Sequence, residues 1–232
     1  MESFAIFITF LGQSCFLLET PQGKILMDPY NPQLGYPVKP VAADIVTVSH
    51  EHFDHNYVEM SSGAPAVLRG LKGQGKTADW NEVRFDKDGL KIRSFPAYHD
   101  ASKGSERGKD AMFLIETDGL RILHTGDLGR VLDEKLVKEI GRVDILLICV
   151  GGHYTIGPEE AKKVVDELHP RVVIPMHWKT KRTGQLPIQD ETAFLAMFKN
   201  VRRADDARFG FTADLSAFPK DQTTILRLPY RE

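Results

Sequence analysis

Four side chains able to bind a metal ion lie within six residues of one another. His50, His52, Asp54 and His55 directly follow the largely apolar run at residues 44–49. In an extended chain, residues i and i+2 point to the same side, so His50 and His52 could bind one ion together. Asp54 and His55 come after the chain has begun to turn, and they would face a second position. Imidazole and carboxylate are ligand types of zinc, and they also suit iron and manganese.

The same segment could instead be a group of solvated surface histidines. Four donors this close cannot by themselves fill two coordination spheres, so the choice depends on further ligands. Three such residues each follow a strand-like run: His99 after residues 90–95, Asp127 after residues 120–124 and His177 after residues 172–176. Taken singly, each of these residues is better interpreted as a structural histidine or a surface aspartate than as a metal ligand. With His50 they place metal-binding side chains at the carboxyl ends of four strands, where layered α/β proteins gather their sites.

Turn signals and apolar periodicity divide the chain into many strands and few helices. Tight turns between strands are predicted at residues 21–23, 88–89 and 118–119, and further strands at residues 3–11, 45–49, 145–150 and 223–228. Helical spacing of apolar residues predicts helices at residues 132–140, 158–168 and 190–198. Residues 70–76 and 102–109 are rich in Gly and Lys and predict surface loops. This order predicts sheet layers covered by helices, in one domain over residues 1–232.

The order H-x-H-x-D-H, then His, Asp and His resembles the metallo-β-lactamase superfamily through nearly the whole chain. Asp28-Pro29 and the segments at residues 124–127 and 174–177 support the resemblance. They are similar to the branch with L-ascorbate-6-phosphate lactonase and N-acylphosphatidylethanolamine phospholipase D. The resemblance implies an α/β fold, a four-layer αββα sandwich, with the metal site at one edge of the two sheets.

The resemblance also implies a ligand set for two divalent ions, with zinc expected and manganese or iron as alternatives. His50, His52 and His99 would hold the first ion. Asp54, His55 and His177 would hold the second, and Asp127 would bridge them. The implied activity is metal-dependent hydrolysis, in which a metal-bridging hydroxide attacks a small phosphorylated or otherwise anionic substrate, a lactone or a phosphodiester. Asp54 would be the catalytic residue, because it would orient the nucleophile and could move its proton.

Four further residues could contact a ligand or the substrate. His124 lies close to Asp127 in sequence and could orient a ligand through a hydrogen bond or simply pack structurally. His153 and Tyr154 follow a predicted strand and could reach substrate. Lys179, with the basic residues after it, could bind a phosphate or carboxylate, or form a solvated turn. We also expect residues 100–110, which follow His99, to form a mobile loop over the site mouth.

Bulk composition is that of an ordinary soluble globular protein. The 232 residues are 42% hydrophobic and 27% charged, and the net charge of −2 gives no reason to expect a nucleic-acid partner. No signal peptide and no membrane span are visible, and Cys15 and Cys149 are expected to be buried free thiols. We therefore expect a cytoplasmic protein with a small-molecule substrate, and a homo-oligomer remains open.

Two other classes compete with the hydrolase. A mononuclear iron dioxygenase-like redox enzyme on the same fold shares the first motif. A non-catalytic protein stabilised by metal would also retain ligands. Complete retention of seven donors argues against the second, because a purely structural site is normally closed and mononuclear.

Overall fold

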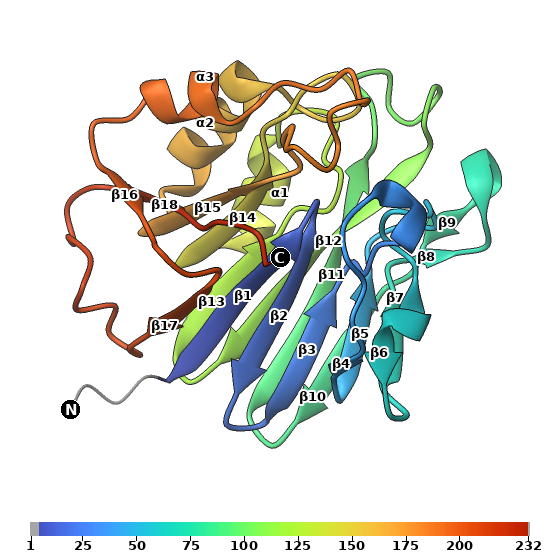
Figure 1. The fold of residues 1–232 in the computed structure, drawn as a ribbon, viewed down its shortest axis with the longest axis horizontal. Coiled ribbons are helices and arrows are strands. Elements are labelled where there is room, and N and C mark those ends of the chain that lie inside the picture. Colours follow the sequence, from blue (N-terminus) through green and yellow to red (C-terminus); the bar gives the residue numbers. More distant parts are fainter. Residues whose placement is uncertain (1–4, 232) are drawn as a thin grey trace.

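Two β-sheets face one another in the computed structural model, which describes residues 5–231 (Figure 1). Residues 3 and 4 of the predicted first strand, and most of the segment inspected for a signal peptide, lie outside the described residues. The smaller sheet has the order β17 (Arg208–Phe211), β1 (Ile6–Gly12), β2 (Cys15–Thr20), β3 (Gly23–Met27), β5 (Ile45–Val48), β7 (Ala66–Arg69). The larger sheet has the order β10 (Arg84–Lys87), β11 (Leu90–Tyr98), β12 (Lys109–Thr117), β13 (Leu120–His124), β14 (Ile145–Cys149), β15 (Val172–Met176), β18 (Thr224–Arg227), β16 (Val201–Arg203).

Short elements complete the described chain. Two small ladders pair β4 (Val41–Ala42) with β6 (Ser61–Ser62) and β8 (Leu71–Lys72) with β9 (Asp79–Trp80). The helices are α1 (Glu134–Ile140), α2 (Pro158–Leu168), α3 (Thr192–Ala196) and the 3-10 turns η1 (Pro32–Leu34), η2 (Val58–Met60) and η3 (Gly75–Thr77). None of the helices within residues 5–231 has the length and apolar character needed to span a membrane.

The period-two pattern of the smaller sheet sends alternate side chains into two separate cores. Phe16 and Leu18 of β2 belong to the large core shared with the other sheet, whereas Cys15 and Leu17 face the opposite side. That outer face is covered by the chain around η1 and η2, through Leu34, Tyr36 and Met60. The α-helices alternate in sequence with strands of the larger sheet between β13 and β16, and α2 packs on β14. The predicted two-sheet sandwich is confirmed, with 3-10 turns and loops as the layer over the smaller sheet.

Helix ends explain where the predicted helices differ from those observed. The helix at residues 158–168 has the predicted bounds, with Pro158 in its first turn and the Glu160 carboxylate accepting from Gly157 N at 3.2 Å. The helix predicted at residues 132–140 begins at Glu134, because Asp133 caps it by accepting from Leu136 N. The α-helix predicted at residues 190–198 is only five residues long, Thr192–Ala196.

Both cysteines are free and buried, as predicted.

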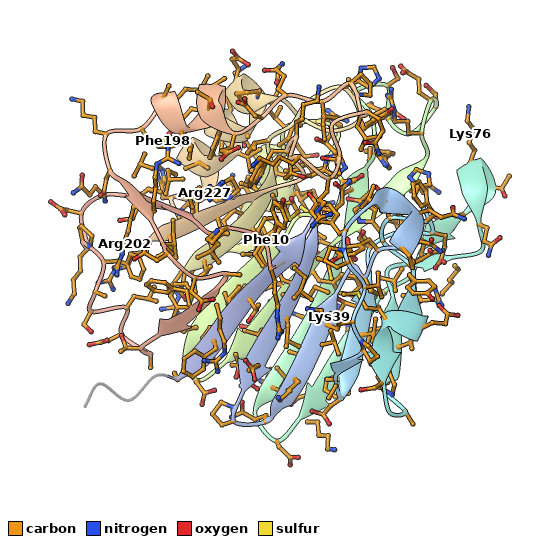
Figure 2. All side chains as sticks on the ribbon, viewed as in Figure 1. Phe10, Lys39, Lys76, Phe198, Arg202 and Arg227 are labelled. Atoms are coloured by element: carbon orange, nitrogen blue, oxygen red, sulfur yellow. The ribbon has the colours of Figure 1, made fainter. Side chains whose placement is uncertain are left out.

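Aromatic contacts join the two sheets directly beneath the edge that carries the predicted ligands. The Phe16 ring of β2 stacks on Phe10 at 4.8 Å between centroids and meets the His124 ring of β13 edge-on at 6.0 Å. Figure 2 shows Phe10 amid crowded side chains, whereas Lys76 projects away from the body of the molecule. The packing of the two sheets therefore fixes the relative positions of the segments that follow them.

Phe16→Ala should lower the free energy of unfolding by about 3–5 kcal/mol, because it leaves a cavity between the sheets. Val67→Ala is the control: Val67 is 38% exposed on an edge strand, and its loss should cost less than about 0.5 kcal/mol. Urea denaturation followed by circular dichroism measures both. Equal stability of the two variants would contradict the inter-sheet core described above.

Candidate metal centre

The predicted ligands meet because four strands end at one edge of the sandwich. β11 and β13 each run antiparallel to β12, and β13, β14 and β15 are parallel to one another. The carboxyl ends of β11, β13 and β15 therefore lie at the same edge, followed by His99, Asp127 and His177. His50 follows β5 of the facing sheet. The two sheets supply the site jointly.

Three imidazoles form the first cluster: His50, His52 and His99. Their donor nitrogens converge, since His52 Nδ1 lies 3.0 Å from His50 Nε2 and 3.2 Å from His99 Nε2. One ligand atom from each lies within 4.8 Å of those of the others. His50 and His99 are buried, whereas His52 is exposed and faces the site opening.

Four donors form the second cluster: Asp54, His55, Asp127 and His177, again with ligand atoms within 4.8 Å of one another. Asp127 Oδ2 lies 3.2 Å from His55 Nε2 and 3.4 Å from His177 Nε2. The same oxygen lies 3.3 Å from Nε2 of His99, a member of the first cluster. Asp127 therefore stands between the clusters, which is the position expected of a bridging ligand.

A buried carboxylate on Asp28 orients the second cluster. Its Oδ2 accepts from His55 Nδ1 at 2.8 Å, which leaves His55 Nε2 free to ligate. Ser49 anchors the same carboxylate, donating from its backbone N at 2.8 Å and from Oγ at 2.6 Å. Asp28 has φ +44°, a left-handed conformation in which Asp and Asn are tolerated. In the sequence, Asp28-Pro29 stands out only as part of the family pattern.

A second buried carboxylate, Asp110, faces the first cluster. Its Oδ1 lies 3.1 Å from His50 Nδ1, so it favours ligation through His50 Nε2. Gly126, just before Asp127, makes room for it: a Cβ there would approach an Asp110 oxygen to 2.6 Å, and φ is +57°. Asp110 was expected only as the end of a loop, although it is the second residue of β12.

Gln13 supports two members of the second cluster from the β1–β2 turn. Its Nε2 donates to Asp54 Oδ2 at 2.9 Å, and its backbone carbonyl accepts from His177 N at 2.8 Å. Gln13 is buried and adopts φ +54°. The sequence carries no signal for this role, because both contacts are long-range.

The remaining predicted residues divide into two groups. His124 is buried, accepts from Gly126 N at 3.1 Å and donates from Nε2 to Ser14 O at 2.8 Å, so it orients the segment before Asp127. The Tyr154 carbonyl accepts from His99 Nδ1 at 3.1 Å. His153 is exposed. Lys179 lies outside the site cavity, in a separate pocket beside Asp190 and Glu191.

Burial and mutual charge set the protonation of the clusters. Burial holds the pKa of His50 well below its usual value, with His55 adding repulsion, and burial likewise lowers the pKa of His52. Burial opposes a charged His55, but Asp127 and Asp54 outweigh it and raise its pKa well above the ordinary range. Burial also opposes ionised Asp127, but His177 and His55 hold its pKa well below the ordinary range.

The donor set fits divalent metal ions. Within residues 5–231, His55 Nε2 and Asp127 Oδ1 are buried atoms without a hydrogen-bond partner. Buried polar atoms of this kind are normally paired or ligate a metal. Five imidazoles and two carboxylates in two converging clusters match the ligand preferences of zinc, manganese and iron.

A cavity of about 390 Å³ opens over both clusters. Its walls include Gln13, Leu34, Phe53, Arg107, Tyr154 and Leu186. Arg107 belongs to the segment at residues 100–110, so this segment lies at the site mouth as predicted. Its predicted mobility stays a prediction.

Comparison with known proteins places the chain in a family. The model of the beta-lactamase superfamily domain matches residues 7–177, which contain all seven donors. A UPF0173 metal-dependent hydrolase of Thermococcus kodakarensis is 35% identical over 190 residues, covering 75% of this chain and 84% of that protein. A Thermotoga maritima structure assigned as a Zn-dependent hydrolase of the metallo-beta-lactamase superfamily is 35% identical, with TM-score 0.73, covering 96% of this chain and 98% of that one.

The fold extends to more distant proteins. The isothiocyanate hydrolase from Delia radicum gut bacteria is 18% identical with TM-score 0.65, covering 89% of this chain and 99% of that one, and shares the fold. The chain therefore belongs to the metallo-β-lactamase superfamily and, within it, to the UPF0173 metal-dependent hydrolases. The predicted superfamily is confirmed. The finer placement near L-ascorbate-6-phosphate lactonase and N-acylphosphatidylethanolamine phospholipase D stays a prediction.

Asp28→Asn should weaken zinc binding about tenfold to hundredfold, because His55 loses the charged partner that fixes its orientation. Asparagine keeps the shape and tolerates φ +44°. Asp118→Asn is the matched control, since Asp118 has φ +48° in the β12–β13 turn. Competition with a chromophoric chelator gives the dissociation constants. Equal zinc affinities of the two variants would show that Asp28 does not contribute to metal binding.

Zinc affinity should also fall on acidification, beginning above the pH at which an ordinary histidine gains its proton. Asp127 raises the pKa of both His55 and His99 against the opposing effect of burial. Protons therefore compete with metal at these imidazoles at a higher pH than at an ordinary histidine. The same chelator competition, repeated between about pH 8 and pH 5, measures this dependence. An affinity that stays constant down to about pH 6 would contradict a raised pKa at these two imidazoles.

Proposed function

We propose that the two clusters bind two divalent cations, zinc being the leading candidate, and that the pair hydrolyses a small anionic substrate, a lactone or a phosphodiester. The observation that carries this proposal is Asp127 Oδ2, which lies within 3.4 Å of imidazoles from both clusters. His50, His52 and His99 are the proposed ligands of the first ion. Asp54, His55 and His177 are those of the second, and Asp127 is shared.

When bound, such cations lower the pKa of water and polarise a carbonyl or phosphoryl oxygen. The chain's own residues then position the reaction. Asp54 is the proposed catalytic residue: it lines the cavity, and Gln13 fixes its carboxylate. Burial opposes its ionisation, yet His55 keeps its pKa below the usual value. An ionised Asp54 can accept a hydrogen bond from the attacking water and hold its proton.

Most side chains of the two clusters are shielded from bulk water. His50, His55, His99, Asp127 and His177 are each at most 2% exposed, so electrostatic interactions among them are weakly screened. An anionic substrate is supported by Arg107 in the cavity wall. The basic residue predicted for this task, Lys179, lies in another pocket. The single-domain organisation, the cytoplasmic location and a homo-oligomer stay predictions.

Asp54→Asn should lower kcat by at least about a hundredfold, because the amide cannot hold the proton of the nucleophile. Asp86→Asn, an exposed carboxylate variant on β10, is the control and should match the wild type. A panel of lactones, phosphodiesters and thioesters is assayed after reconstitution with zinc, manganese or iron(II), and metal content is measured on the same samples. Two ions per chain are expected in the wild type.

Asp127→Ala should reduce the occupancy of both sites, whereas His52→Ala should weaken mainly the first. Wild-type turnover by fully metallated Asp54→Asn protein would show that Asp54 is not a catalytic residue. Substrate conversion that depends on iron and molecular oxygen would contradict the proposed hydrolysis and favour the redox enzyme.

A further inference from the structure

The cavity above the clusters has an apolar wall formed by Leu34, Phe53 and Leu186. These side chains come from three separate segments: η1, the ligand segment after β5, and the loop after β15. Phe53 is 51% exposed although it stands between His52 and Asp54. An exposed aromatic ring beside buried metal-binding side chains leaves apolar surface that the apolar part of a bound molecule could cover.

Arg107 faces this cavity with little to neutralise it. Its side chain is 30% exposed, and the described ion-pair partner is Glu106, 3.5 Å away and itself 59% exposed. Such solvated pairs contribute little. The guanidinium lies 5.6 Å from the centre of the Tyr154 ring, and the Tyr154 carbonyl accepts from ligand His99. Among the described lining residues, Arg107 is the one Lys or Arg.

The segment that carries Arg107 is held in place by Asp100. The buried Asp100 carboxylate accepts from the backbone N of Gly104 at 2.9 Å, Glu106 at 3.1 Å and Arg107 at 2.8 Å. His99 N also donates to Gly108 O at 3.1 Å and closes the loop. The base of the Arg107 side chain is therefore fixed relative to His99, and less entropy is lost when it binds an anion.

We propose, building on the proposed hydrolysis at this site, that the substrate is a small amphiphilic anion. Its charged group binds the Arg107 guanidinium, and its apolar group lies against Leu34, Phe53 and Leu186, so that the scissile bond is held over the two clusters. A guanidinium presents paired donors to an oxyanion. Arg107 and the apolar wall are thus specificity-determining. A polynucleotide does not fit, since it requires a row of cations.

Binding of two matched dyes tests this proposal without any turnover. 8-Anilinonaphthalene-1-sulfonate is an amphiphilic anion, and N-phenyl-1-naphthylamine is its analogue without the sulfonate. Fluorescence titration of the zinc-reconstituted protein gives both dissociation constants. Arg107→Gln should weaken binding of the sulfonate dye about tenfold and change binding of the neutral dye less than about twofold. Phe53→Ala should weaken both dyes, and Phe53→Leu should restore most of the affinity.

Arg130→Gln is the control, because Arg130 lines a separate pocket beside Tyr98 and Val131. It should leave both dissociation constants unchanged. Unchanged sulfonate-dye affinity in Arg107→Gln, or unchanged affinity for both dyes in Phe53→Ala, would overturn the proposal, provided that circular dichroism shows both variants folded. Failure of the hydrolysis panel with these dye results intact would overturn the proposed reaction alone.

Discussion

The buried carboxylate of Asp127 is the constraint on which the rest of the site depends. It is 2% exposed, and a charge in such a place is tolerated only when it is paired or ligates a metal. Its Oδ2 has imidazoles from three different segments within 3.4 Å. These segments follow β5, β11 and β15, so the ends of strands from both sheets must meet at one point. The sandwich geometry satisfies this requirement.

Each sheet contributes one further carboxylate that orients an imidazole from behind. Asp28 follows β3 of the smaller sheet and fixes His55, whereas Asp110 lies in β12 of the larger sheet and faces His50. Close backbone approaches keep the frame tight: a Cβ at Gly151 would come within 2.2 Å of His177 O. The same inter-sheet packing that stabilises the fold thus sets the ligand geometry.

Local sequence was sufficient to single out the seven candidate donors, which the structure brings together in two clusters, because H-x-H-x-D-H and the strand ends are short-range patterns. The residues that orient these donors, Asp28 and Gln13, could not be predicted because their contacts with the donors are long-range in sequence. Asp28 lies 27 residues from His55 and Gln13 lies 41 residues from Asp54, and tertiary contact alone joins them. Lys179 is a candidate for substrate binding in the sequence because it follows His177 closely. His177 has φ +51°, the chain turns there, and Lys179 enters a different pocket. Arg107 has the position in the cavity wall instead.

Three edge strands of the two main sheets, β7, β16 and β17, were not predicted, and the fourth, β10, was implied only by the predicted turn at residues 88–89. Edge strands are half solvated and often charged, so they lack the apolar alternation on which such predictions depend. Val201–Arg203 and Arg208–Phe211 carry arginines on exposed positions. Interior strands such as β14, buried at every residue, were predicted nearly to their bounds. Strands buried in the sheet interior could therefore be predicted from the sequence, whereas the half-exposed edge strands could not.

Anomalous diffraction at the zinc edge, from crystals grown with zinc, would show whether Asp127 lies between two bound metal ions. Two peaks are expected, one among His50, His52 and His99 and the other among Asp54, His55 and His177, with Asp127 beside both. A single peak under zinc-replete conditions, or peaks away from Asp127, would contradict this arrangement.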